Sequence, residues 1–349
     1  MQATITIAGS NAEPLGGRVS DNDTGANCTQ QKMCTKGQTQ EQKVAARYRM
    51  VALDLDGTLL APDHKITDAS VEYLRRLHVQ GFTVAIATGR SPSSTSEVIR
   101  RLDLSHALPH SCHGFPLVCM NGACGLNVKI CPDTGELSYT ELFHDPVPRD
   151  VTTKVLKLAS KMGLVVNYYN GLDGIYAQPI SESHRHSTRR YTELTGTPIK
   201  SVDDNYEELL SKGLPSKLLV FCEEDTIDDL TEKLTTELNN EAHVIRGSPP
   251  FFVEVLNKEV CKGHGLERMC EQLQIGLDET IAFGDGDNDI EFVECAGRGF
   301  AMKNARDTLK KVADDVTKWT NGEDGVVRTL EEMERHGLLQ LASKSSTCC

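Results

Sequence analysis

The amino-acid sequence predicts an α/β fold, a doubly wound parallel sheet with an inserted α+β domain. The first observation is an alternation of elements near the start of the chain. An apolar strand at residues 49–55, a helix at 67–79 and a second apolar strand at 82–88 follow one another. Continuous apolar strands joined by a helix are typical of a parallel sheet that is covered on both faces.

The second observation is that the same alternation returns late in the chain. Helix, strand, helix and strand are expected at residues 262–273, 280–283, 287–296 and 299–302, with a further helix after them. Between the two blocks, residues 128–257 mix helices with separated strands and contain more turn residues. This change of texture indicates that an α+β domain is inserted into the parallel one.

The expected organisation has five segments. They are a disordered tail (1–46), a first core segment (47–127), the insertion (128–257), a second core segment (258–340) and a flexible tail (341–349). The first tail is rich in Gly, Gln, Asn, Thr and Ser and lacks apolar periodicity, a composition that cannot bury a core. Inside the insertion, helices are expected at 147–162 and 227–238, and strands at 164–169, 174–178, 217–221 and 251–256.

Composition excludes several classes of partner. The 349 residues carry a net charge of −13 without clustered Lys and Arg, so neither a nucleic-acid surface nor an anionic membrane surface is expected. No apolar run reaches the roughly 18 to 20 residues of a membrane helix, and the N-terminus lacks the features of a signal peptide. The twelve cysteines form no C-x-x-C pair and fit a reducing compartment. We therefore expect a cytoplasmic protein, either a monomer or a homodimer.

Polar side chains follow several of the predicted strands. They are Asp54 and Asp56 after the first strand, Thr88 and Arg90 in "TGR" after the second, and Asp285, Asn288 and Asp289 in "GDGDND" after residues 280–283. Lys262 stands where a predicted helix begins. Because ligands of open α/β sheets bind beyond the carboxyl ends of the strands, these stretches are expected to converge on one edge.

This grouping suits phosphoryl transfer. One carboxylate can attack phosphorus to form an aspartyl-phosphate, and a second carboxylate two residues later can protonate the leaving oxygen and then activate water. Mg²⁺ prefers oxygen ligands and would relieve the repulsion between the carboxylates and the phosphate. Lys262 and Thr88 would donate to phosphoryl oxygens, and Gly57 would let the backbone turn close to them.

Each feature has an ordinary explanation when it stands alone. Isolated D-x-D pairs are frequent in loops, Lys262 could be a solvated helix residue, and "TGR" could be a turn. A calcium loop is excluded, because Ile290 and Ala296 occupy the positions of its invariant glycine and bidentate glutamate. The weight of the features therefore lies in their order and context.

The motifs resemble those of the haloacid dehalogenase superfamily, specifically its Cof-type phosphatases. The resemblance covers residues 49–338 and includes "DLDGT", "TGR", the lysine of "CKG" and "GDGDND" in order, with "NGA" at 121–123 and "AMKNA" at 301–305. It implies a Rossmann-like core and a large α+β cap that closes over the site and supplies specificity. One departure is a longer loop with His106, His110, Cys112 and His113, which meets no fixed zinc-ligand spacing and is expected to be a surface loop.

The resemblance also implies roles for individual residues. Asp54 would be the nucleophile and Asp56 the acid/base. The residues expected to bind phosphate or substrate are Leu55, Gly57, Thr58, Thr88, Gly89, Arg90, Asn121, Lys262 and Asn288. The expected cofactor is Mg²⁺, with Asp54, Asp56, Asp285 and Asp289 at its site, Asp56 through its backbone carbonyl and Asp289 as an orienting acid behind the metal.

The expected function is Mg²⁺-dependent hydrolysis of small phosphorylated metabolites such as sugar phosphates, nucleotides or phosphorylated cofactors, because a capped site suits molecules that it can enclose. A phosphomannomutase-type phosphotransferase is the main alternative, since it shares D-x-D-G-T and a similar cap, although "TGR" resembles the hydrolases more. A catalytically silent sensor or scaffold is opposed by the complete set of expected catalytic residues. Substrate choice would lie in the cap, for which residues 168–173 are a candidate loop.

Overall fold

The computed structural model describes residues 48–104, 114–131, 133–172, 174–202, 206–247 and 249–339. The two expected tails, 1–46 and 341–349, lie outside the described residues, and so do the loop residues His106, His110, Cys112 and His113. In the part of the chain that is described, no helix combines the length and the apolar character needed to span a bilayer.

Eight strands form the core sheet, in the order β14-β13-β12-β1-β2-β3-β4-β5. Neighbouring strands from β14 to β3 are parallel, and β4 and β5 extend the sheet with antiparallel pairs. All four residues of β1 are buried, as expected for a strand covered on both faces. The strands are β1 (Met50–Leu53), β2 (Thr83–Ala87), β3 (Phe115–Cys119), β4 (Cys124–Ile130), β5 (Leu137–His144), β12 (Thr280–Gly284), β13 (Arg298–Ala301) and β14 (Asp315–Val316).

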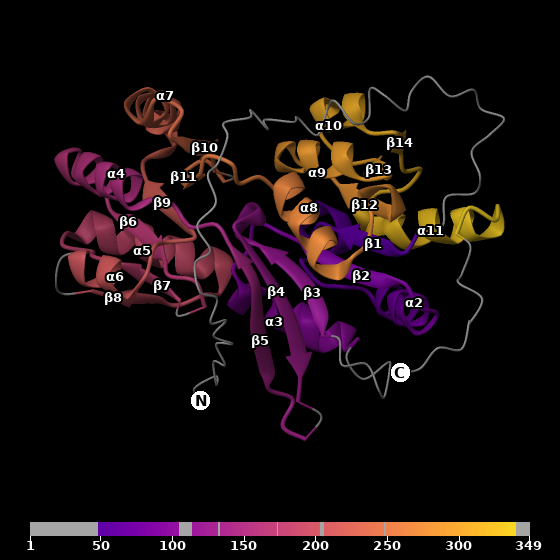
Figure 1. Ribbon diagram of the computed structural model, residues 1–349. Coiled ribbons are helices and arrows are strands. Elements are labelled where there is room, and N and C mark those ends of the chain that lie inside the picture. Colours follow the sequence, from indigo (N-terminus) through magenta and orange to yellow (C-terminus); the bar gives the residue numbers. More distant parts are fainter. Residues whose placement is uncertain are drawn as a thin grey trace, which may run out of the picture.

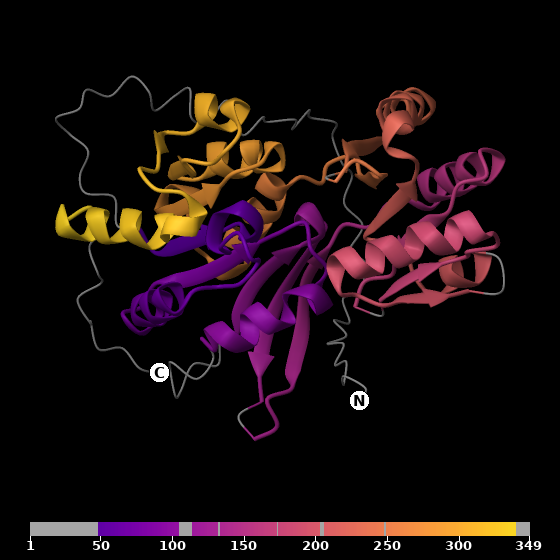
Figure 2. The same ribbon diagram turned by 180° about the vertical axis from the view of Figure 1, so that it is seen from behind.

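Helices cover both faces of the core sheet, α2 and α3 on one face and α8 and α9 on the other (Figures 1 and 2). From β1 the chain proceeds to β2 and β3 in one direction, and from β12 to β13 and β14 in the opposite direction. Right-handed crossovers in opposite directions place their helices on opposite faces, so the sheet is doubly wound. The helices are α2 (Asp68–Val79), α3 (Pro92–Leu102), α8 (Lys262–Leu273), α9 (Ile290–Cys295), α10 (Asp307–Val312) and α11 (Gly325–Arg335).

A second sheet of six strands, in the order β10-β11-β9-β6-β7-β8, forms the cap beside the core (Figure 1). Its pairs are antiparallel except for β7 with β8. The strands are β6 (Val166–Tyr169), β7 (Ile175–Ala177), β8 (Ile199–Ser201), β9 (Lys217–Phe221), β10 (Ala242–Arg246) and β11 (Phe252–Asn257). The helices are α4 (Arg149–Lys161), α5 (Glu182–Thr195), α6 (Glu207–Lys212) and α7 (Ile227–Leu238).

Strand alternation gives the cap sheet two different faces. Leu218 and Val220 of β9 pack in one apolar cluster with residues of α4, α6 and α7. Leu219 and Phe221, one residue out of phase, belong instead to the cluster that continues into the core. Lys217 shares the phase of Leu219 and Phe221, so this charged residue lies on the face of the cap sheet that adjoins the core.

The predicted fold class, an α/β core with an inserted α+β cap, is confirmed, but the insertion begins later than the predicted residue 128. The strands β4 and β5 still pair within the core sheet, which the chain leaves only after His144. The physical reason is that β5 is an edge strand with several exposed residues. Its mixed burial lacks the continuous apolar sequence that predicted β1, β2, β12 and β13.

Candidate active site

The carboxyl ends of β1, β2 and β12 meet at one edge of the core sheet. Leu53, the last residue of β1, lies opposite Ile86 of β2 and Phe283 of β12. The next residue, Asp54, donates its backbone N–H to the carbonyl of Phe283 at 3.1 Å. The strand order reverses between β1 and β12, and ligands of doubly wound sheets bind at such a switch point.

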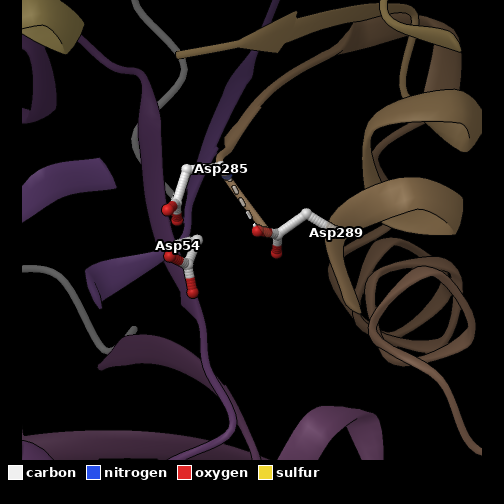
Figure 3. A group of neighbouring side chains, drawn as sticks. All are labelled: Asp54, Asp285 and Asp289. Carbon is white, nitrogen blue, oxygen red and sulfur yellow. Dashed lines mark hydrogen bonds between the residues drawn. The ribbon is translucent and has the colours of Figure 1, made fainter. Parts of the chain in front are cut away.

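Three carboxylates gather at this edge, from Asp54, Asp285 and Asp289 (Figure 3). One oxygen from each lies within 4.8 Å of the others. Asp54 is only 5% exposed and Asp289 only 1%. Buried carboxylates this close repel one another, so the arrangement needs positive charge nearby.

Part of that charge comes from Lys262, the first residue of α8. Its buried Nζ donates to Asp54 Oδ1 at 2.6 Å and to Asp289 Oδ1 at 2.5 Å. Burial alone would lower the pKa of Lys262, but the charges of Asp289 and Asp54 outweigh that effect and raise the pKa above its ordinary value. Lys262 therefore remains an ammonium ion.

One ammonium does not balance three carboxylates. Burial raises the pKa of Asp54 well above its ordinary value, with a further rise from Asp289 and Asp285 that Lys262 only partly offsets. Burial and the charge of Asp289 likewise raise the pKa of Asp285 to about 6. A cluster of hard oxygen donors with surplus negative charge fits a divalent cation such as Mg²⁺.

Backbone and hydroxyl groups fix the positions of the carboxylates. Asp289 Oδ2 accepts the backbone N–H groups of Asp285 at 3.0 Å and Gly286 at 2.9 Å. The hydroxyl of Thr58 donates to Asp285 Oδ1 at 3.2 Å. Gly57 has a φ of +80°, and a Cβ there would lie 2.2 Å from Asp285 Oδ2. Gly57 and Thr58 thus allow the loop after Asp56 to pack against Asp285.

Asp56 lies apart from the three clustered carboxylates. Arg90 Nε donates to Asp56 Oδ2 at 2.7 Å, the Arg90 Nη2 group pairs with Oδ1, and His64 Nδ1 lies 3.2 Å from Oδ1. Burial raises the pKa of Asp56, but its hydrogen bonds to Arg90 and His64 and their charges outweigh that effect and hold the pKa below its ordinary value. The structure thus places Arg90, expected to bind substrate, on the expected acid/base.

The remaining predicted residues surround this centre in different ways. Thr88 is buried, and its Oγ1 accepts the backbone N–H of Arg90 at 3.2 Å. Asn288 Nδ2 donates to Asn121 Oδ1 at 3.0 Å. The side chain of Leu55 belongs to the apolar core, so only its backbone is available to a ligand.

Sequence reasoning missed two charged residues of the cap that reach the site loops. Lys217 Nζ donates to the carbonyl of Gly89 at 3.1 Å and to both oxygens of Glu254 at 3.1 Å. Asn121 Nδ2 donates to Glu254 Oε2 at 3.1 Å. The available signal was a charge within an apolar strand, in "KLLVF" and in "FFVEVL".

Comparison with known proteins agrees with this geometry. A family model described as haloacid dehalogenase-like hydrolase matches residues 51–330. The chain is 28% identical over 285 residues to the 5-amino-6-(5-phospho-D-ribitylamino)uracil phosphatase YitU of Bacillus subtilis (strain 168), covering 81% of this chain and 96% of that one. It is 30% identical over 267 residues to the HMP-PP phosphatase of Enterobacter sp. (strain 638), covering 75% of this chain and 86% of that one.

A solved structure shows the same fold. The crystal structure of a haloacid dehalogenase-like hydrolase from Bacteroides thetaiotaomicron matches with a TM-score of 0.67 and 26% identity, covering 82% of this chain and all of that one. The family model spans most of the chain, both matched relatives are named phosphatases, and the matches include core and cap together. The chain therefore belongs to the haloacid dehalogenase-like hydrolases, as a phosphatase of the Cof type.

Proposed function

We propose that the protein hydrolyses small phosphorylated metabolites with the aid of Mg²⁺, through an aspartyl-phosphate on Asp54. The observation that carries this proposal is the contact of Lys262 with Asp54, at the end of β1, and with Asp289. A third carboxylate, that of Asp285, lies beside them. The carboxylates there, which have surplus negative charge, can bind one divalent cation, and the ammonium of Lys262 can donate to one phosphoryl group. The same chemistry explains why so much charge is buried at one point.

Asp54 would act as the nucleophile. Its carboxylate oxygen forms a bond to phosphorus while the bond between phosphorus and the ester oxygen breaks, and Asp56 transfers a proton to that leaving oxygen. Water then attacks the aspartyl-phosphate, Asp56 takes up a proton from this water, and inorganic phosphate and free Asp54 are regenerated. Asp54, Asp285 and the carbonyl of Asp56 would hold Mg²⁺, with Asp289 behind it, and the ion would supply positive charge against the phosphate.

The contact with Arg90 would make the protonation of Asp56 depend on whether a substrate is bound. To protonate a leaving group, Asp56 must carry a proton, which the contact with Arg90 opposes by lowering the pKa of Asp56. A phosphate ester is a competing anion for the guanidinium of Arg90. We infer that substrate draws Arg90 away from Asp56, so that the acid can take up its proton only when a substrate is present.

The cap and the relatives support the proposed substrate class. The names of two relatives specify phosphorylated small molecules, a ribitylaminouracil phosphate and HMP-PP. A cap that contacts the site loops directly encloses molecules of that size and keeps bulk water out. Sugar phosphates, nucleotides and phosphorylated cofactors are therefore the classes to test.

The test is a phosphate-release screen over those classes, with Mg²⁺ or with EDTA. Asp54→Asn serves as the blank, because removal of a nucleophile is expected to lower kcat by at least about 10³-fold while the nearly isosteric amide preserves the fold. Asp287→Asn is the matched control, because Asp287 lies between Asp285 and Asp289 in the sequence but is exposed and pairs with Arg306 and Thr308 rather than with the cluster.

Three results would contradict the proposal. They are phosphate release that persists in Asp54→Asn, equal rates with EDTA, and transfer of phosphate to another position of the substrate. The last result would indicate a mutase. Circular dichroism of both variants shows whether a loss of activity reflects a loss of fold.

A further inference from the structure

Two buried charges of the cap, Lys217 and Glu254, face the core. They lie on the neighbouring strands β9 and β11 and are 2% and 9% exposed. Lys217 Nζ donates to both carboxylate oxygens of Glu254 at 3.1 Å and lies 4.9 Å from the centre of the Tyr169 ring. Burial alone would lower the pKa of Lys217, but the charge of Glu254 raises it above its ordinary value.

Stability alone does not account for this pair. Burying two charges costs several kcal/mol per ion, and apolar residues of similar volume usually serve as well or better. The neighbouring side chains on this face are apolar or aromatic, Leu219 and Phe221 among them. A buried ionic pair in such surroundings is therefore expected to have a role in specificity or positioning.

Both charges have a partner in the core, and each partner has the complementary polarity. The ammonium of Lys217 donates to the carbonyl of Gly89, which lies between Thr88 and Arg90. The carboxylate of Glu254 accepts from Asn121 Nδ2 at 3.1 Å. A donor of the cap meets an acceptor of the core, and an acceptor of the cap meets a donor, so the two contacts together specify one placement of the cap.

The Asn121 contact leads on into the catalytic centre. With Nδ2 bound to Glu254, the amide of Asn121 presents Oδ1 to Asn288 at 3.0 Å. The following residue, Gly122, has a φ of +102°, and a Cβ there would lie 2.1 Å from the carbonyl of Cys261. Cys261 directly precedes Lys262, so the loop that Glu254 holds packs closely against the start of α8.

We propose that Lys217 and Glu254 are positioning residues of the phosphatase reaction, which hold the cap on the two site loops in one closed placement and orient the Asn121 amide towards Asn288. Neither residue needs to touch the phosphate. This inference rests on the proposed function, because the reaction is what the closed placement would serve. It assigns the closing contacts of the cap to a matched pair of charges on β9 and β11.

A charge swap separates this role from a merely structural one. In Lys217→Glu/Glu254→Lys the ion pair within the cap is restored, but a carboxylate faces the Gly89 carbonyl and an ammonium faces the amide N–H groups of Asn121. If the Asn121 amide rotates to adapt, its N–H groups turn towards the donor Nδ2 of Asn288. The swap therefore preserves the pair and reverses both contacts with the core.

We expect Glu254→Met and Lys217→Met, which remove the acceptor and the donor outright, to lower kcat/KM on the order of 10- to 100-fold, the loss typical of reacting groups displaced by about 1 Å. The swap should recover most of the thermal stability that Lys217→Met loses but none of the activity. The control is the swap Lys154→Glu/Glu241→Lys, which reverses an exposed ion pair within the cap and should keep wild-type rates. A Lys217–Glu254 swap as active as wild type would overturn the proposal.

A second readout makes the inference separable from the proposed function. Small-angle scattering of the full chain should show a compact wild type and a more extended Glu254→Met, because methionine has no oxygen to accept from Asn121 Nδ2 and the cap loses this contact. Should wild type release no phosphate from any compound, the proposed function fails. Scattering still decides the inference in that case: an extended Glu254→Met supports the closing contact, and identical curves overturn it.

Discussion

The described residues include two buried lysines, Lys262 in the core and Lys217 in the cap, which differ in the number of carboxylates around them. Lys262 in the core meets two carboxylates with a third beside them. Lys217 in the cap meets one carboxylate and a backbone carbonyl. The first cluster has surplus negative charge, whereas the second is balanced. Charge balance, rather than burial, therefore distinguishes a cluster that can accept a cation from a pair that joins core and cap.

Of the changes that test this difference between the two clusters, Lys262→Met has the largest expected effect. Removal of a donor that faces the developing charge should lower kcat on the order of 10²- to 10³-fold. Without metal, the carboxylate cluster loses the ammonium that contacts Asp54 and Asp289, and a stability loss of about 3–5 kcal/mol is expected. Saturating Mg²⁺ should restore part of that stability, because it supplies charge at the same point. Thermal unfolding with EDTA and with Mg²⁺ measures the difference.

Lys217→Met provides the counterpart to that experiment. It also leaves a buried carboxylate unpaired, so a loss of similar size, about 3–5 kcal/mol, is expected. Mg²⁺ should not restore stability beyond the increment seen for wild type, because Glu254 belongs to no group of three metal-ligating side chains in the described residues. Equal recovery of both variants by Mg²⁺ would remove the distinction between the two clusters.

A smaller effect is expected from glycines, and it tests how tightly the core cluster is packed. Gly57→Ala and Gly163→Ala each place a side chain at positive φ, at a cost of roughly 1–2 kcal/mol. Only at Gly57 would the new Cβ strike Asp285, whereas nothing lies within 4 Å at Gly163. Gly57→Ala should therefore lower kcat on the order of 10²-fold, as misplaced reacting groups do. Gly163→Ala should lose stability alone, and a similar loss of activity in both variants would argue against close packing at Asp285.

The two clusters also differ in how far the sequence predicts them. The core cluster was predictable because each member follows a recognisable strand or begins a recognisable helix, and a parallel sheet brings its carboxyl ends together. No such rule relates Lys217 to Gly89 or Glu254 to Asn121. Their contact depends on how one sheet docks on another, which no local pattern specifies.

Other differences have equally local causes. The helix α5 was not predicted, because its only buried residues are His184, Thr188 and Tyr191, too few and too polar for an apolar stripe. Residues 168–173 were suggested for substrate choice, but Tyr168 packs in the cluster with α4 and α7 and donates its hydroxyl to the carbonyl of Gly213 at 2.7 Å. Strand alternation turns Tyr169 instead towards the core-facing side, where it lies beside Lys217.

The smallest expected effect concerns pH at the junction of core and cap. His144 ends β5, and its Nε2 lies 2.9 Å from the hydroxyl of Ser216, the residue before Lys217. Burial lowers the pKa of His144 below its ordinary value. The unfolded chain therefore binds a proton at a higher pH than the folded one, so the stability contributed above the ordinary pKa of about 6.5 is lost as pH falls through the folded pKa.

Thermal unfolding between pH 7.5 and 5.5, with Mg²⁺ present throughout, measures this contribution. His144→Gln keeps a polar partner for Ser216 but has no proton to gain, so its unfolding temperature should fall less on acidification than that of wild type. His78→Gln is the matched control, because burial also lowers the pKa of His78 but its ring meets the carbonyl of Phe82, within the core. Both variants should flatten the response of stability to pH, whereas only His144→Gln should also flatten the response of cap closure measured by scattering. An identical closure response in the two variants would mean that His144 titrates without loosening the junction, which would leave the Lys217–Glu254 pair as the contact that holds the cap there.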